Sequence, residues 1–217
     1  MLVQHSGIDP LDFKSYKVTL DTSTDGEADY MWTYEVGNED ETHPTLVLLH
    51  GYAASGMIFY RCFPYLAEHF HLILVDLPGM GRSSRHHFDL EEPDEIEQYL
   101  IDALESWRDK MQLKEMYLCG HSFGGYLSTI YALQFEHRVK KLLLFSPVGV
   151  PPQPEDFTFE KKMEGKSWKM RNLMKLVRFM WTREYSFQGA LRKLGRGPAS
   201  LCIKKFVGTR MKKCPDD

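Results

Sequence analysis

Residues 118 to 126 read LCGHSFGGY, in which Gly120, Ser122 and Gly124 form the pattern G-x-S-x-G. An apolar stretch leads into this pattern, and a stretch with helical apolar spacing leads out of it. This context predicts a nucleophile elbow, a sharp strand-to-helix turn that presents a serine hydroxyl above a sheet. The alternative is that the two glycines only let a strand and a helix pack closely. The flanking stretches favour the elbow, with Ser122 as a nucleophile for acyl transfer.

A second glycine-containing loop could supply hydrogen-bond donors to the same reaction. The stretch LLHGYAASG, residues 48 to 56, is an apolar run that ends in such a loop. A tetrahedral oxyanion needs two backbone N–H groups, one from the residue after the nucleophile and one from this kind of loop. We therefore predict an oxyanion hole made by the N–H groups of Phe123 and Tyr52, with Ala53 as the next candidate. We interpret His50 as a structural histidine of the loop.

A serine also needs a base, and the chain does not offer one. In this arrangement the partners follow in the order Ser, Asp or Glu, His. The last histidine is His137, which would lie about 22 Å from Ser122 along a helix. The stretch FSPVG offers Ser146 and no carboxylate, and Asp216 and Asp217 have no strand before them. The sequence therefore predicts a serine at a nucleophile elbow, without the carboxylate and the histidine that would complete a catalytic triad.

Strands and helices alternate along the first two thirds of the chain. SYKVTL and DYMWTYEV alternate apolar and polar residues and predict a hairpin. Four apolar runs then predict parallel strands buried on both faces, and the intervals between them have helical spacing. We expect an α/β fold, a mostly parallel sheet with helices on both faces. The runs are TLVLLH (45–50), HLILVD (71–76), EMYLCG (115–120) and KLLLFS (141–146), and the clearest helical stripe is Ile96, Leu100, Ile101, Leu104 and Trp107.

Length and composition fit a globular protein with one sizeable core. Hydrophobic residues make up 43% and charged residues 26% of 217 residues, which argues against disorder and against a membrane-spanning protein. The net charge of −3 is uneven. Residues 1–150 carry 11 Lys and Arg against 23 Asp and Glu, whereas residues 151–217 carry 16 against 7. We therefore divide the chain into a core part, 1–150, and a basic helical segment, 151–217.

No motif predicts a metal or an organic cofactor. The stretch DLPGMGRSS, residues 76 to 84, contains neither a P-loop nor a dinucleotide-binding pattern, so we predict a structural turn there. The start of the chain lacks the features of a signal peptide, and we expect an intracellular, cytoplasmic protein. The cysteines show no ligand spacing and no disulfide framework; they are Cys62, Cys119, Cys202 and Cys214.

The basic segment contains an amphipathic stretch at 161–183. Its apolar residues approximate one helical face, and lysines and arginines line the rest. This pattern suits contact with an anionic phospholipid surface, but the same face could equally pack over an active-site mouth. Nucleic-acid binding is disfavoured because no nucleic-acid motif accompanies the charge. The apolar face is Trp168, Leu173, Met174, Val177, Met180 and Trp181.

Taken together, LVLLHGYAASG, ILVDLPGMGRSSR and LCGHSFGGYLSTIYALQFEHRVKKLLLFSPVGVP resemble the α/β-hydrolase superfamily in order and spacing. Within it, GRSSR, ESWRDKMQL and SPVGVPPQPEDF resemble the subfamily of the lipid-droplet lipase co-activator, an N-acyl-phospholipid lysophospholipase and the cardiolipin deacylases. The resemblance covers about residues 44 to 217. It implies an α/β-hydrolase fold, a lid within 151–217 and an intracellular phospholipid acyl hydrolase. The co-activator branch has Asn where this chain has Ser122, so the resemblance favours the hydrolytic branch.

The superfamily pattern would place two more strands after the lid, with the acid following one strand and the histidine following the other. The sequence stops before either, so we expect a C-terminally truncated hydrolase whose last parallel strand has an open edge. The alternatives are a short pseudoenzyme, or a product whose missing part comes from another chain.

The leading interpretation is a serine carboxylic-ester hydrolase of lipid metabolism, acting on a phospholipid or lysophospholipid through an acyl-enzyme. It needs no metal or cofactor, and it is inactive as this chain because it lacks the acid and the histidine. One alternative is a non-catalytic protein that binds lipid surfaces. Another is a lysophospholipid acyltransferase, since an alcohol can replace water in resolving the acyl-enzyme. Each of these fits peripheral contact with an intracellular membrane, a lipid droplet or a mitochondrion.

Overall fold

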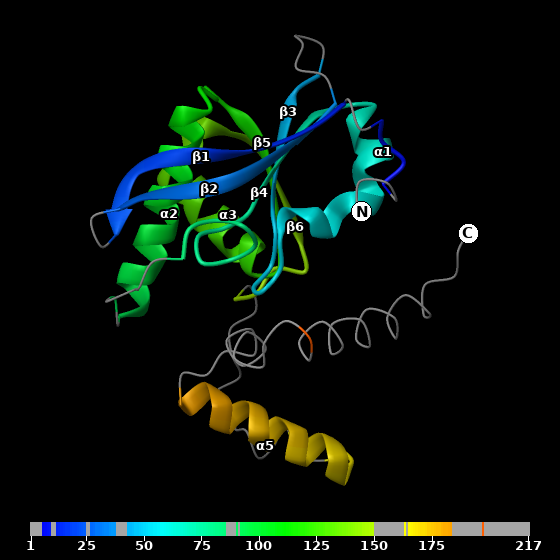
Figure 1. The fold of residues 1–217 in the computed structure, drawn as a ribbon, viewed down its shortest axis with the longest axis vertical. Coiled ribbons are helices and arrows are strands. Elements are labelled where there is room, and N and C mark those ends of the chain that lie inside the picture. The colour runs from blue at the N-terminus through cyan, green and yellow to red at the C-terminus, as the bar shows by residue number, and fades with distance from the viewer. Residues whose placement is uncertain are drawn as a thin grey trace. The chain divides into compact units, whose positions relative to one another are not determined.

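The computed structural model describes residues 6–9, 12–24, 27–37, 43–85, 90, 92–149, 163, 165–183 and 197. The chain divides into two compact units, residues 1–152 and residues 153–217. The first holds a six-stranded sheet with helices on both faces (Figure 1).

The sheet contains the predicted hairpin and the four predicted parallel strands. The hairpin strands, β1 (Phe13–Thr24) and β2 (Glu27–Val36), pair with each other in antiparallel orientation. On its other edge, β2 pairs antiparallel with β4. The other strands run parallel, and the spatial order is β1-β2-β4-β3-β5-β6. The predicted fold class is therefore confirmed. The parallel strands are β3 (Thr45–Leu49), β4 (His71–Val75), β5 (Met116–His121) and β6 (Val139–Phe145).

Helices cover the sheet unequally. On one face, α2 (Pro93–Lys110) and α3 (Phe123–Gln134) pack over the larger apolar cluster, and the short η4 (Glu136–Arg138) follows α3. On the other face lie η3 (Gly56–Cys62) and α1 (Phe63–Ala67), with a smaller cluster (Figure 1). Both faces therefore carry helices, but the face with α1 has less cover.

The first of the intervals predicted to be helical, MIFYRCFPYLAEHF (57–70) between β3 and β4, is a 3₁₀ turn followed by a short α-helix. Ser55 caps the 3₁₀ turn by accepting the Met57 N–H. Pro64 has no N–H to donate to the Tyr60 carbonyl, and the Phe63 N–H bonds that carbonyl instead, in the i to i+3 pattern. The prediction of an α-helix was therefore correct only for Phe63–Ala67.

The stripe predicted on α2 is buried except at its first member. Trp107 is fully buried, and its indole N–H donates to Thr33 Oγ1 at 2.9 Å, so the helix is tied to β2. Ile96 is exposed. It belongs to the first turn of the helix, one turn before the buried stripe begins, so the prediction was wrong at that position. The buried members are Leu100, Ile101, Leu104 and Trp107.

The last strand, β6, lies at the edge of the sheet, as predicted for the final parallel strand. Its residues from Lys140 to Phe145 are all exposed. The expectation that all four parallel strands are buried on both faces is therefore confirmed for β3 and β4, holds for most of β5 and is wrong for β6. Strand β6 has the apolar sequence of an interior strand in an edge position.

In the second unit, the described part contains α5 (Trp168–Thr182), which matches the predicted amphipathic helix. Its side chains at Trp168, Leu173 and Val177 are exposed, whereas the side chains of Met180 and Trp181 lie outside the described residues. Most of residues 151–167 and 184–217 also lie outside them, including Cys202 and Cys214. No described helix is long and apolar enough to cross a membrane.

A buried carboxylate ties the hairpin to the parallel strands. Glu35 on β2 accepts a hydrogen bond from the Tyr16 hydroxyl and lies 3.7 Å from His71 Nε2 and 3.8 Å from Lys14 Nζ. The contact with His71 and the Tyr16 hydrogen bond hold the pKa of Glu35 below its usual value, although burial opposes the shift. The ionised form of Glu35 therefore contributes to the stability of the fold.

This contribution predicts an acid-sensitive stability. A group whose pKa is lower in the folded state stabilises the fold above its unfolded pKa, and the stabilisation is lost as the pH falls through the folded pKa. We expect the free energy of unfolding to fall as the pH goes from about 5 to about 3, and to fall less steeply in Glu35→Gln. Urea unfolding at each pH measures this. Glu68→Gln, at an exposed site, should keep the wild-type slope, and an equal slope in Glu35→Gln would contradict the prediction.

Candidate active site

Ser122 stands at the turn between β5 and α3 with φ 55° and ψ −116°. A positive φ is uncommon for a residue with a side chain and costs conformational energy. Backbone hydrogen bonds hold it in place: the Ser122 N–H donates to the Phe145 carbonyl at 3.0 Å, and the Ser122 carbonyl accepts from Gly125 at 3.0 Å and from Val148 at 3.2 Å. The side chain makes no helix-capping hydrogen bond. The predicted strand-to-helix turn is present, and its hydroxyl is not used as a cap.

The two glycines of the motif are required by close backbone approaches. A Cβ on Gly120 would lie 2.3 Å from the Gly124 carbonyl oxygen, and a Cβ on Gly124 would lie 2.4 Å from the Leu49 carbonyl oxygen. Real Cβ atoms do not approach carbonyl oxygens this closely. The close-packing interpretation of the glycines is thus correct, and it is compatible with the elbow, because the same packing brings α3 against β3 and β5.

The loop after β3 lies directly beside Ser122. A Cβ on Gly51 would lie 3.0 Å from the Ser122 Cβ and 3.4 Å from its Oγ. Tyr52 follows with an exposed side chain, and Ala53 has φ 63°. Phe123 is the first residue of α3, where N–H groups have no partner within the helix. The fold thus brings the loop of Tyr52 and the N-terminus of α3 to Ser122. The nucleophile role of Ser122 and the oxyanion role of these N–H groups stay predictions.

His50 has both ring nitrogens engaged by the backbone. Its Nε2 accepts the Leu77 N–H at 3.0 Å, so its Nδ1 carries the proton and donates to the Gly51 carbonyl at 2.7 Å. Burial is the largest effect on this group and lowers the pKa of His50, which keeps the ring neutral. These contacts fit the predicted structural role, because a ring with both nitrogens occupied is not free to take a proton from Ser122.

Asp76 organises the loops around the site, and sequence reasoning did not single it out. The carboxylate is fully buried and accepts the Gly56 N–H at 2.7 Å, the Arg82 N–H at 2.8 Å and the Tyr34 hydroxyl at 3.0 Å. A Cβ on Gly81, which has φ 51°, would overlap the carboxylate at 2.1 Å. The glycine-rich stretch 76–84 therefore wraps around Asp76 as a structural turn. The available signal was an acidic residue between a buried strand and that turn.

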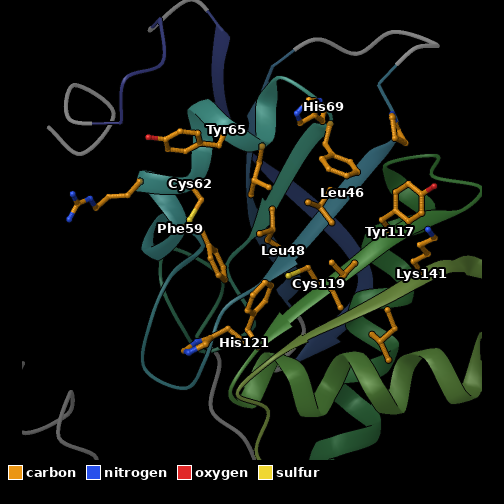
Figure 2. A pocket seen from close by; sticks show the side chains of 17 residues that line it. Leu46, Leu48, Phe59, Cys62, Tyr65, His69, Tyr117, Cys119, His121 and Lys141 are labelled. Carbon is orange, nitrogen blue, oxygen red and sulfur yellow. The ribbon is translucent and has the colours of Figure 1, made fainter. Parts of the chain in front are cut away.

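Within the described part of the chain, no histidine or carboxylate hydrogen-bonds to Ser122 Oγ. His137 lies in η4, beyond the far end of α3. The His121 ring extends away into a groove on the face of the sheet that carries α1, where it meets Phe59 edge-on (Figure 2). His5, His86 and His87 lie outside the described residues. The described residues also hold no group of three or more potential metal ligands.

The model of the alpha/beta hydrolase fold family matches residues 44–182. The chain belongs to the α/β-hydrolase family. A 1-acylglycerol-3-phosphate O-acyltransferase of Arabidopsis thaliana is 35% identical over 184 residues, which cover 82% of this chain and 42% of that protein. A (lyso)-N-acylphosphatidylethanolamine lipase of Mus musculus is 36% identical over 126 residues, which cover 58% of this chain and 36% of that protein.

Among solved structures, a bacterial membrane phospholipase A described as a virulence factor aligns with a TM-score of 0.58 and 25% identity, covering 72% of this chain and 46% of that one. These relatives confirm the resemblance to α/β hydrolases of lipid metabolism. The chain spans less than half the length of each of these three proteins.

Proposed function

We propose that this chain carries the nucleophile and the oxyanion hole of a serine acyl hydrolase, with a phospholipid or lysophospholipid as substrate. The observation that supports this most is the left-handed backbone at Ser122 with the Gly51 loop packed against its hydroxyl. The named activities of the Arabidopsis and mouse relatives support a lipid substrate. We place the protein in the cytoplasm, at a lipid surface.

In the proposed reaction, Ser122 Oγ attacks the ester carbonyl and a base takes the hydroxyl proton. The N–H groups of Phe123 and Tyr52 donate to the oxyanion, and collapse of the intermediate expels the alcohol and leaves an acyl-serine that water hydrolyses. No step requires a metal or an organic cofactor. The described residues hold no base for the first step, so we expect the chain alone to be inactive.

The role of Ser122 can be tested by supplying the base from solution. A fluorophosphonate probe reacts with a serine only when a base accepts the proton, so we expect no labelling of the chain alone. Added imidazole should produce labelling at Ser122, read by mass spectrometry, and Ser122→Ala should abolish it. Ser146→Ala is a matched control, because Ser146 also has a positive φ and follows the next parallel strand.

Three results would count against this function. Absence of labelling with imidazole would contradict the nucleophile role. Labelling that Ser122→Ala leaves unchanged would assign the reactivity to another residue. Strong labelling without imidazole would show that the chain holds a base of its own.

An acyltransferase is the second candidate, and the Arabidopsis relative favours it because it bears that activity in its name. The two reactions share the acyl-serine and differ in whether water or a lysophospholipid hydroxyl resolves it. A non-catalytic lipid-surface protein is the third candidate, favoured by the cationic amphipathic helix α5. Labelling at Ser122 in the imidazole experiment would argue against this third candidate.

We also propose that α5 contacts anionic phospholipid. Its exposed apolar side chains Leu173 and Val177 lie one turn apart on one side of the helix, and the cations Arg171 and Lys175 lie one turn apart on another side. Each cation near an anionic bilayer contributes about 1 kcal/mol. The double substitution Arg171→Glu with Lys175→Glu should weaken binding to phosphatidylserine-containing vesicles by about tenfold or more. Vesicle co-sedimentation measures this. Lys114→Glu in the first unit is the control, and equal binding by both variants would contradict the proposal.

A further inference from the structure

The stretch GRSSR, residues 81–85, is fixed to the sheet by its two serines. Ser83 and Ser84 are only 0% and 4% exposed, and they bond to β2 beyond the end of β4. The Trp32 N–H donates to Ser83 Oγ at 2.8 Å, and the Tyr30 N–H donates to Ser84 Oγ at 3.2 Å. The arginines on either side of these serines are exposed, so their side chains start from a backbone that is held in place.

The first of these arginines, Arg82, covers an aromatic ring. Its guanidinium carbon lies 3.8 Å from the centre of the Trp32 ring, a favourable cation–π contact. Its backbone N–H donates to the buried Asp76 carboxylate at 2.8 Å. Within the described part of the chain, no acceptor bonds to its guanidinium N–H groups, whereas Arg85 donates to two backbone carbonyls of the same turn. The turn therefore presents two guanidinium charges that no described carboxylate neutralises.

A third exposed cation lies on the same face of the sheet. Lys17 on β1 stands in register with Trp32, and its Nζ lies 4.2 Å from the centre of the Tyr30 ring. Tyr30 and Trp32 are two residues apart on β2, so their side chains lie on one face, about 7 Å apart. Lys17 and Arg82 therefore hold two positive charges over neighbouring aromatic rings.

These charges are unusual for this part of the chain, which is acidic. Residues 1–150 carry 23 Asp and Glu against 11 Lys and Arg, and cations elsewhere in the first unit have carboxylate partners, as Arg108 and Lys140 do. Among the described residues, no carboxylate forms an ion pair with Lys17, Arg82 or Arg85. The indole N–H of Trp32 is also buried without an acceptor. A group of donors and cations that lacks acceptors favours a bound anion.

We propose that Lys17, Arg82 and Arg85 form a binding site for a phosphomonoester group. A guanidinium donates two parallel hydrogen bonds to phosphate oxygens, and an ammonium binds phosphate as a point charge. Two cations about 7 Å apart can donate to opposite sides of one phosphate. A phosphomonoester carries a charge of about −1.5 to −2 at pH 7. Three cations match this charge better than the single charge of a phosphodiester.

The phosphate site lies at the same end of the sheet as Ser122. Three strand spacings, about 14 Å, separate β2 from β5. A phosphomonoester lipid bound at this site would bring a lipid surface to the end of the sheet that carries Ser122. That use of the site rests on the proposed function, whereas the binding itself does not require Ser122. The row that relates the four strands is Thr33, Val75, Leu49 and Gly120.

A soluble probe tests the site in the full chain. Glycerol 3-phosphate should shift the indole N–H resonance of Trp32 in a chain labelled with ¹⁵N at its tryptophans. The resonance of Trp107 is the internal control, because its indole is fully buried and bonded to Thr33, and it should not move. Dimethyl phosphate, a phosphodiester, should bind at least about tenfold more weakly than glycerol 3-phosphate.

Charge-removing variants locate the binding. Arg82→Gln with Lys17→Gln should weaken glycerol 3-phosphate binding about tenfold or more, because hydrogen bonds to a charged group are lost. Both side chains are exposed, and Arg82 bonds to Asp76 through its backbone, so this variant should fold. Arg61→Gln with Lys114→Gln removes the same charge from other exposed sites of the first unit and should bind like the wild type.

Vesicles distinguish a lipid from a free phosphate compound. Co-sedimentation compares phosphatidylcholine vesicles that contain phosphatidic acid with vesicles that contain phosphatidylserine at equal surface charge. Helix α5 is expected to contact both kinds, so a preference for phosphatidic acid reports the phosphate site. A preference that Arg82→Gln with Lys17→Gln removes would identify a lipid as the source of the phosphomonoester. Binding of glycerol 3-phosphate without this preference would identify a soluble compound.

Three results would overturn the proposal: no shift of Trp32 with glycerol 3-phosphate and no preference for phosphatidic acid, equal binding by the two double variants, or equal binding of dimethyl phosphate. Ser122→Ala should bind the phosphate like the wild type. Phosphate binding by a chain whose Ser122 resists fluorophosphonate with imidazole would support the site and contradict the proposed function. Labelling of Ser122 without phosphate binding would do the reverse.

Discussion

Replacing Asp76 by alanine is expected to lower the free energy of unfolding by about 3 to 5 kcal/mol. The carboxylate is fully buried and accepts hydrogen bonds from the Gly56 N–H, the Arg82 N–H and the Tyr34 hydroxyl. Alanine would leave the Gly56 N–H and the Tyr34 hydroxyl buried without an acceptor, and the Arg82 N–H, which is only partly buried, would lose its partner as well. Each buried donor without an acceptor costs about 1 to 3 kcal/mol. Tyr34 cannot compensate by ionising, because burial, above all, raises its pKa to about 12.

Urea unfolding followed by circular dichroism measures this loss. Asp102→Ala is the matched control, because Asp102 is exposed on α2 and accepts one bond from Gln98; it should change stability by about 0.5 kcal/mol or less. Asp76→Asn keeps one side-chain acceptor, so its loss of stability should lie between those of Asp76→Ala and Asp102→Ala. A loss below about 1 kcal/mol in Asp76→Ala would show that the loops stay folded without the carboxylate.

Gly124→Ala is expected to cost about 3 kcal/mol or more. The added methyl group would lie 2.4 Å from the Leu49 carbonyl oxygen and 2.5 Å from the His50 carbonyl oxygen. Both atoms belong to backbone, which cannot move aside as the end of a side chain can, so α3 would have to lift away from β3. That movement would also displace Ser122 from the loop of Gly51.

The same substitution at a second glycine distinguishes the cost of this clash from the cost of backbone strain alone. Gly79 has φ 77°, and no atom lies within 4 Å of the position that an added methyl group would take. Gly79→Ala should therefore cost only the strain of a left-handed alanine, about 1 kcal/mol. Thermal unfolding of both variants compares the two costs. Equal losses of stability in Gly79→Ala and Gly124→Ala would mean that α3 can move away from β3 at little cost. The close-packing explanation of the motif would then fail.

The parallel core was predictable because its signals are local. The runs at 45–50, 71–76 and 115–120 are apolar over their whole length and end at polar or glycine-containing turns, which is enough to predict buried strands. The turn at Ser122 was predictable for the same reason, since the strand, the turn and the helix are contiguous. In contrast, KLLLFS has the same composition but is exposed, because burial of a strand depends on neighbours that its own sequence does not contain.

The role of Asp76 could not be predicted, since its three donors come from three separate segments. Tyr34 lies on β2, Gly56 starts η3, and Arg82 follows in the turn. Only the order of the strands in the sheet brings them to one carboxylate.

The hydrogen bonds of His50 and Asp76 hold the loop after β3 without any contribution from the edge strand β6. His50, in the loop after β3, accepts the Leu77 N–H, and Asp76, in the turn after β4, accepts the Gly56 N–H. These two hydrogen bonds connect the loop to the turn, and neither involves β6. The loop that carries Tyr52 is therefore held by bonds between the ends of β3 and β4, whatever covers the open edge of the sheet. If its N–H groups serve as oxyanion donors, as proposed, their position is set independently of the residue that accepts the proton.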